Sequence, residues 1–196
     1  MAPPPRYLPK IEAYFDLLSK WNRRINLTSL PLDPPSDEAI DRLVIEPLVA
    51  AGQVRPADRL CVDLGSGGGS PGVPLHLATP WVRLVLVEVK VRKSAFLREV
   101  ARQLGLGTVE VENSRFEELL ARSDLLEAAD LVTFRAVRPD RALWNTVQAF
   151  LKPGGRALWF TSGGSLPAFE IPMLSMVAKV SLVRATGSEL VVLEKK

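Results

Sequence analysis

The sequence predicts an α/β fold with a mostly parallel sheet and helices on both of its faces. Short runs rich in valine and leucine alternate with helical segments from Leu60 onward. The first strand, Leu60 to Leu64, leads into a turn with four glycines within residues 65–69. The chain closes on two β-like runs, residues 177–183 and 189–193, with no helix between them. We therefore expect an antiparallel hairpin at one edge of a Rossmann-like sheet.

The length and composition set broad bounds. At 196 residues the chain is long enough for one domain, or for one domain with a small appendage. Its net charge of +3 is compatible with a nucleic-acid partner but does not require one. Cys61 is the single cysteine, which excludes an internal disulfide framework and a cysteine-based metal site. There is no apolar signal region and no run of membrane-spanning length, so we expect a cytoplasmic protein without a membrane partner.

The N-terminal region predicts two helices. Apolar residues recur at helical spacing from Lys10 to Asn26, and the proline-rich stretch from Pro31 to Asp37 breaks this pattern. Ser36 or Asp37 can cap a second helix that ends near Ala50. These helices precede the first strand, so they are expected to form a separate appendage.

The predicted boundary divides residues 1–52, the helical appendage, from residues 53–196, the main domain. Directly after the glycine turn, Ser70 is expected to act as an N-cap and Pro71 to lie in the first turn of a helix. The remaining elements are expected in this order: strand 83–88, helix 91–104, strand 108–112, short helix 115–122, strand 130–134, a helix around 143–150, a turn at 152–155 and strand 156–161.

The glycine turn predicts a nucleotide-type site at the carboxyl edge of the sheet. Gly65, Gly67 and Gly69 fit the G-x-G-x-G turn of S-adenosylmethionine (SAM) enzymes, with Asp63 two residues upstream. Residues 67–72 also fit the dinucleotide pattern G-x-G-x-x-G, but only the first register begins directly after the strand. Glu88 closes the next strand, where a carboxylate would receive ribose hydroxyls of either SAM or NAD. We favour SAM, because the closing hairpin is typical of methyltransferases.

The residues after the fourth strand constrain the methyl acceptor. Carbon-5 of a pyrimidine would need a cysteine nucleophile, and the only candidate, Cys61, lies within a strand. The segment Thr133 to Pro139 is not the Asn/Asp-Pro-Pro-aromatic loop that usually serves exocyclic base amines. An acceptor that is nucleophilic without losing a proton fits best, such as guanine N7, while small-molecule nitrogen or oxygen acceptors stay open. Arg135 and Arg138 lie at this edge, where they could hold substrate phosphate or a cofactor carboxylate.

Four motifs together resemble the RsmG (GidB) family of bacterial small-subunit ribosomal RNA guanine-N7 methyltransferases. The match covers about residues 11–161, and its first two motifs are fairly specific. The motifs are WNRRINLTSL (Trp21 to Leu30), VDLGSGGGSPGVPL (Val62 to Leu75), NSRFEE (Asn113 to Glu118) and FRAV (Phe134 to Val137). The resemblance implies a seven-stranded SAM-dependent methyltransferase fold that acts on 16S ribosomal RNA or the assembling 30S subunit. We expect a monomer.

The resemblance also implies roles for individual residues. It places SAM on Gly65, Ser70, Phe116, Glu117 and Arg135, and Arg135 would also orient the reacting groups. The general methyltransferase pattern adds four cofactor-binding residues, which are Asp63, Gly67, Gly69 and Glu88.

The chain departs from the family pattern at four positions. After the second helix it keeps Arg42 and an acid, Glu46, but has Leu43 in place of a histidine and Pro47 in place of a serine. After the fifth strand it has Ser162 in place of a lysine. Ser70 replaces a bulky apolar residue. Arg42 and Arg138 are the expected RNA-binding residues. The departures keep two other hypotheses open: a methyltransferase with another RNA or a small-molecule acceptor, and a SAM-binding ribosome-assembly factor without catalysis.

Overall fold

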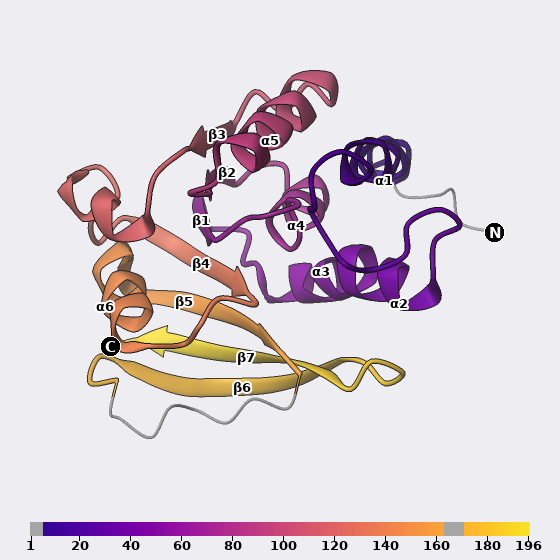
Figure 1. Cartoon of the computed structure of the whole chain (residues 1–196). Helices are drawn as coiled ribbons and strands as arrows, with labels where there is room; N and C mark the ends of the chain where they lie inside the picture. The colour runs from indigo at the N-terminus through magenta and orange to yellow at the C-terminus, as the bar shows by residue number, and fades with distance from the viewer. Residues whose placement is uncertain (1–5, 163–170) are drawn as a thin grey trace.

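The computed structural model describes residues 6–162 and 171–196, so residues 1–5 of the predicted appendage lie outside the described part. Seven strands form one sheet in the order β3-β2-β1-β4-β5-β7-β6 (Figure 1). Neighbours from β3 to β5 pair in parallel, and β7 runs antiparallel to both β5 and β6. The predicted mixed sheet with a closing hairpin is therefore confirmed. The strands are β1 Leu60–Leu64, β2 Arg83–Val87, β3 Val109–Glu112, β4 Ala129–Arg135, β5 Leu151–Thr161, β6 Leu174–Val183 and β7 Ser188–Lys195.

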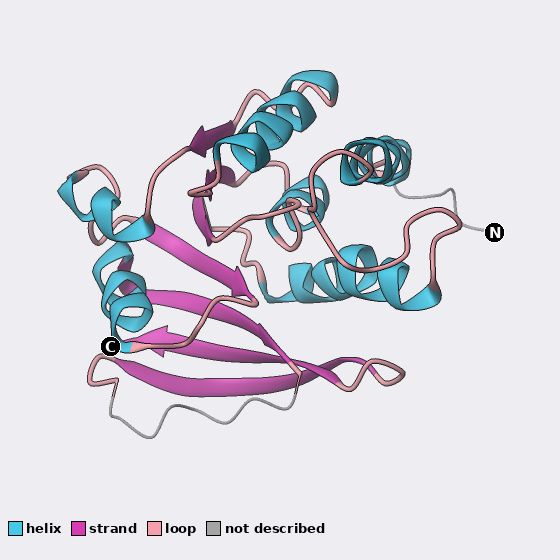
Figure 2. Ribbon diagram, in the orientation of Figure 1, coloured by secondary structure: helices cyan, strands magenta, loops and turns pink. Residues whose placement is uncertain are grey.

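Helices cover both faces of the sheet (Figure 2). One hydrophobic cluster joins helices α1 to α5 to one face, and a second joins α6 and η3 to the other. The helices are α1 Leu8–Asn22, α2 Asp37–Ile40, the π-helix η1 Asp41–Ile45, α3 Glu46–Ala50, the 3-10 helix η2 Ala51–Gln53, α4 Gly72–Ala78, α5 Val91–Gln103, the 3-10 helix η3 Phe116–Ala121 and α6 Arg141–Phe150. None of the described helices is long and apolar enough to cross a membrane.

The central strands are buried on both faces because their side chains alternate between the two clusters. In β1, Cys61 packs in the first cluster, whereas Val62 and Leu64 pack in the second. All five residues of β1 are buried. This explains why every residue of the strand except Asp63 is apolar, as expected for a parallel strand covered on both sides.

The N-terminal helix ends four residues earlier than the apolar spacing predicts. The side chain of Asn22 accepts hydrogen bonds from the Leu27 and Thr28 amides, at 2.8 and 3.0 Å, and so folds the chain back after the helix. The second predicted helix is confirmed as the helical run from α2 to α3. Ser36 caps it, since its hydroxyl accepts from the Ala39 amide at 3.1 Å.

Two local predictions in the main domain are wrong. Ser70 does not cap α4, because Pro71 holds the N-cap position and the Val73 amide donates to the Gly69 carbonyl at 2.6 Å. The Ser70 hydroxyl accepts no hydrogen bond from an amide of this helix start. The expected turn at residues 152–155 lies inside β5 as an irregularity, since pairing with β4 moves from Ala129–Leu151 to Leu131–Arg156.

Candidate active site

The glycine turn lies where the order of the sheet reverses. β1 has β2 on one side and β4 on the other, and such a reversal opens a crevice at the carboxyl ends of the strands. Gly65, Gly67 and Gly69 have φ angles of +71°, +54° and +89°, which a side chain would strain. The amides of Gly65 and Ser66 donate to the Val87 carbonyl, at 2.9 and 3.0 Å, and tie the turn to the end of β2. The turn is thus fixed beside an open crevice.

A cavity of about 500 Å³, which we call the turn cavity, lies over these glycines. It is lined by the turn on one side and by the appendage on the other. Tyr14, which is fully buried in α1, donates its hydroxyl to the Gly68 carbonyl at 2.7 Å and joins the two sides. The lining residues are Leu18, Leu27, Thr28, Ser29, Leu30, Glu38, Arg42, Leu43, Gly65, Ser66, Gly67, Gly68, Ser70, Glu88, Lys90, Lys93, Arg135 and Ala136.

Glu88 lies directly after β2 and holds the turn through its side chain. Its Oε2 accepts from the Gly67 amide at 2.9 Å, and its Oε1 accepts from the Lys90 amide at 2.8 Å. Glu88 and Gly65 also line a smaller cavity of about 220 Å³, which we call the β3 cavity. Phe116 and Glu117 line this cavity as well. The structure therefore brings the predicted acid and the two η3 residues together in one continuous crevice.

Two of the predicted cofactor-binding residues do not line these cavities. The Asp63 side chain is fully buried, and its Oδ1 accepts from the Thr133 hydroxyl at 2.5 Å. Burial raises the pKa of Asp63 to about 6. Gly69 faces α1 and α5, since a Cβ built there would lie 3.3 Å from Tyr14 and from Leu97. Both residues therefore lie on the side of the turn that faces the protein interior, away from the cavities.

Ser70 is placed differently from both. It lines the turn cavity, and its buried hydroxyl has no hydrogen-bond partner in the described part of the chain. A buried hydroxyl without a partner is costly, which favours a ligand that supplies one. The residue that sequence reasoning placed as a helix cap is thus available to a ligand.

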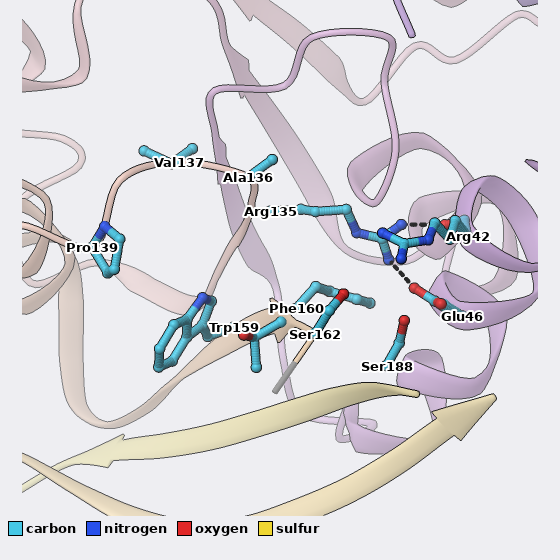
Figure 3. A pocket seen from close by; sticks show the side chains of 11 residues that line it. Arg42, Glu46, Arg135, Ala136, Val137, Pro139, Trp159, Phe160, Ser162 and Ser188 are labelled. Carbon is cyan, nitrogen blue, oxygen red and sulfur yellow. Dashed lines mark hydrogen bonds and ion pairs between the residues drawn. The ribbon is translucent and has the colours of Figure 1, made fainter. Parts of the chain in front are cut away.

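Arg135, the last residue of β4, lies at the wall between the turn cavity and a third cavity (Figure 3). Its Nη2 lies 2.9 Å from Glu46 Oε2, its Nη1 donates to the Arg42 carbonyl, and its guanidinium lies 4.6 Å from the Phe160 ring centre. Burial lowers the pKa of Arg135, and the Glu46 carboxylate opposes this shift. Arg135 is therefore a buried, paired cation that touches both cavities.

The third cavity, which we call the edge cavity, has a volume of about 350 Å³ and opens at the ends of β4 and β5. It shares Arg42, Arg135 and Ala136 with the turn cavity. Its other lining residues are Glu46, Val137, Pro139, Trp159, Phe160, Thr161, Ser162 and Ser188. Arg138 does not line it and is exposed next to it.

The sequence reasoning noted Glu46 as the acid kept from the family pattern but did not single it out as a site residue, although it pairs with Arg135. Its signal was weak: an acidic residue one helical turn after Arg42, directly before Pro47. The departures from the family pattern also lie at these cavities, since Leu43 lines the turn cavity and Ser162 the edge cavity. Within the described residues, no group of three or more His, Cys, Asp or Glu side chains could hold a metal ion.

The strand order, the antiparallel seventh strand and the glycine turn after β1 define a methyltransferase of the Rossmann-like class. Solved structures agree with this fold. The mitomycin 7-O-methyltransferase MmcR has a TM-score of 0.63 and 18% identity, over 97% of this chain and 70% of that one. A variant of MtNAS in complex with S-adenosylmethionine has a TM-score of 0.62 and 17% identity, over 95% and 74%.

Sequence comparisons give the family. The family model GidB, described as rRNA small subunit methyltransferase G, matches residues 7–185. Ribosomal RNA small subunit methyltransferase G of Neisseria gonorrhoeae is 34% identical, over 95% of this chain and 88% of that protein. The protein of the same name from Xylella fastidiosa is 33% identical, over 97% and 87%. The chain belongs to the rRNA small subunit methyltransferase G family, which confirms the resemblance seen in its motifs.

Proposed function

We propose that the chain transfers a methyl group from SAM to N7 of a guanine in small-subunit ribosomal RNA. The observation that carries this proposal is the position of Arg135 between two adjoining cavities. A methyl donor in one cavity and an acceptor in the other would meet beside Arg135, where the two cavities adjoin. When bound, SAM supplies a methyl group on a sulfonium, and transfer requires the acceptor lone pair to be aligned with it.

The turn and β3 cavities suit SAM. Glu88 lies where they meet and would receive the ribose hydroxyls, while Phe116 and Glu117 would flank the adenine. Ser70 would hydrogen-bond to the polar end of the cofactor. Gly65, Gly67 and Gly68 line the turn cavity and leave the turn backbone open to the ligand, as expected for such a site. Asp63 and Gly69 would contribute indirectly, through the shape of the turn.

The edge cavity suits a flat base. Val137, Pro139 and Trp159 give it apolar walls, and Ser162 and Ser188 give it hydroxyl groups. Guanine N7 carries an exposed lone pair and loses no proton before attack, so the reaction needs no general base. Arg42 and the exposed Arg138 would bind RNA phosphates near the edge cavity.

We propose that the chain acts as a monomer on ribosomal RNA or on the assembling 30S subunit. The relatives named above are bacterial proteins, so we assign the reaction to the cytoplasm, where bacterial ribosomes assemble.

The test is methyl transfer from labelled SAM to small ribosomal subunits from a bacterial strain that lacks the corresponding enzyme. Nuclease digestion then identifies the labelled nucleoside. We expect the label in 7-methylguanosine. Label in another nucleoside would overturn the acceptor but not the enzyme class. SAM binding without any transfer would favour an assembly factor without catalysis, or another acceptor that matches Leu43 and Ser162.

Two variants separate cofactor binding from turnover. Glu88→Ala removes the acceptor of the Gly67 and Lys90 amides, so SAM affinity should fall by about tenfold or more. Arg135→Ala should mainly lower the rate of transfer. Calorimetric titration with SAM and single-turnover assays measure the two effects. Unchanged SAM affinity in Glu88→Ala would contradict the site as proposed, and Glu194→Gln, which breaks an exposed pair with Arg55, is the control.

A further inference from the structure

Glu46 is a buried acid at the start of α3, and its carboxylate is fully engaged. It is 2% exposed. Its Oε2 pairs with Arg135 at 2.9 Å (Figure 3). Its Oε1 accepts from the Thr186 hydroxyl at 3.0 Å. Thr186 belongs to the connection between β6 and β7. One carboxylate thus joins the appendage, the end of β4 and the closing hairpin.

The π-helix before Glu46 provides a second acceptor for the same arginine. The Glu46 amide donates to the Asp41 carbonyl, five residues back, as a π-helix requires. The next amide in this pattern would be that of residue 47, which is proline and has no N–H. The Arg42 carbonyl therefore has no partner of this kind, and Arg135 Nη1 donates to it instead. Glu46 thus pairs with Arg135 through its carboxylate, and Pro47, which has no N–H, leaves the Arg42 carbonyl free to accept from Arg135.

These contacts hold the guanidinium on several sides. Nη1 donates to the Arg42 carbonyl, Nη2 forms an ion pair with Glu46 that lacks hydrogen-bond geometry, and the centre of the Phe160 ring lies 4.6 Å from the guanidinium. The Arg135 side chain is only 17% exposed, so the pair is shielded from solvent. A buried charge that loses its partner moves or takes up water, because an unpaired charge is costly in such a place.

We propose that Glu46 is a positioning residue, which together with the Arg42 carbonyl fixes Arg135 in the orientation that methyl transfer requires. The inference rests on the proposed function, because it concerns the residue at the wall between the two cavities. Glu46 does not itself need to touch SAM or RNA. Its effect on the reaction passes through Arg135.

The first test compares Glu46→Gln with Glu46→Asp and with Asp58→Asn. Asp58 forms another buried pair, with Arg156 at 2.7 Å, so it is a matched control for the loss of a buried ion pair. We expect Glu46→Gln to lower single-turnover transfer to small ribosomal subunits by about 30-fold, since small misplacements of a reacting group are costly. Its SAM affinity should stay within about threefold of wild type. Glu46→Asp should restore part of the rate, and Asp58→Asn should lower the melting temperature without this loss.

A double-mutant cycle with Arg135→Lys tests the route of the effect. If Glu46 acts through Arg135, then Glu46→Gln should lower the rate of the Arg135→Lys enzyme by less than about threefold. If the rate losses of Glu46→Gln and Arg135→Lys multiply in the double variant, the proposal is overturned, and a direct contact of Glu46 with a substrate is indicated.

A spectroscopic measurement keeps the inference independent of activity. In wild-type protein labelled on arginine, NMR should resolve separate signals for the two terminal nitrogens of Arg135, because rotation of a held guanidinium is slow. In Glu46→Gln these signals should merge. If wild type transfers no methyl group but the signals behave in this way, the proposed function fails and the positioning contact stands. Arg135 signals that do not change in Glu46→Gln overturn the positioning role.

Discussion

At the scale of single residues, the site depends on buried acids with different surroundings. Glu88 accepts two backbone amides, and Glu46 faces an arginine and a hydroxyl. The Asp63 carboxylate accepts a hydrogen bond only from the Thr133 hydroxyl, and its Oδ2 has no partner among the described residues. Burial dominates at Asp63, which is why its pKa rises to about 6.

The raised pKa of Asp63 predicts a defined pH dependence of stability. The folded protein retains this proton up to about pH 6, whereas the unfolded chain releases it near pH 3.8. The contribution of Asp63 is therefore most favourable below pH 3.8 and is lost as pH rises to about 6. Asp63→Asn, which cannot ionise, should be more stable than wild type by about 1–3 kcal/mol at neutral pH.

Urea unfolding at pH 4 and pH 7.5 measures this difference. The gain of Asp63→Asn should nearly vanish at pH 4, where the wild-type carboxyl is protonated in the folded state. A gain of equal size at both pH values would show that shape or hydrogen bonding, and not ionisation, separates the two proteins.

Residue-level prediction from sequence worked where a residue's place in a strand decides its position. Glu88 and Arg135 directly follow or end buried strands, so the sheet brings them to one edge. Glu46 could not be found in this way. Its role depends on Arg135, 89 positions later, and on Thr186 in the closing hairpin, and no local pattern reports those contacts. The position of Asp63 in the motif was predicted correctly, but the motif does not predict that its side chain is buried under the turn and hydrogen-bonded to Thr133.

At the scale of elements, the end of α1 shapes one wall of the turn cavity. Asn22 accepts from the Leu27 and Thr28 amides, and its own amide donates to the Thr28 carbonyl at 3.1 Å. These bonds fix the loop that carries Leu27 to Leu30 into the cavity wall. One side chain thus sets both the length of the helix and the position of the loop.

Asn22→Ala should therefore destabilise the protein and weaken SAM binding together. Loss of three hydrogen bonds to partly buried groups should cost about 1–3 kcal/mol of unfolding free energy. SAM affinity should fall by about tenfold. Thermal unfolding and calorimetric titration measure the two effects, and Asn26→Ala is the control, since Asn26 is exposed in the same loop. A loss of stability with unchanged SAM affinity would separate the loop from the cofactor site.

The elements themselves were largely predictable, because their apolar periodicity reflects burial on two faces of a sheet. The predictions failed where backbone hydrogen bonds compete. Apolar spacing continues through Ile25, but the Asn22 side chain captures the amides that follow the helix. Serine is a residue type favoured at the N-cap, yet at this helix start the Val73 amide donates its hydrogen bond to the Gly69 carbonyl and not to the Ser70 hydroxyl. Which acceptor each backbone amide bonds to depends on the three-dimensional path of the chain, and the residue types alone do not predict it.

At the scale of the whole molecule, the predicted boundary after residue 52 divides the sequence but not the core. The first hydrophobic cluster contains Tyr14 and Leu18 from α1 together with Leu86 and Leu97 from the main domain. Trp21 lies against Phe96 of α5, with ring centres 5.7 Å apart. The division into 1–52 and 53–196 stays a prediction, and the shared core gives it a measurable consequence.

Urea unfolding should be a single transition for the whole chain. Far-UV circular dichroism, which reports all helices and strands, and tryptophan fluorescence, which includes Trp21, should give the same midpoint. Saturating SAM should move both curves together, because binding to the folded state stabilises the whole cooperative unit. An earlier transition seen by one probe alone would mean that the appendage unfolds as an independent domain.

The hydrogen bond from Tyr14 to Gly68 also limits how this architecture can be recombined. The segment that precedes the catalytic sheet contains the helices from α1 to α3. Here that segment contributes a buried donor to the glycine turn itself, at 2.7 Å. A chimaera that joins a foreign leader to residues 53–196 would leave the Gly68 carbonyl without this donor. The glycine turn thus depends on the segment before residue 53, and a transplanted segment would have to supply a donor in place of Tyr14.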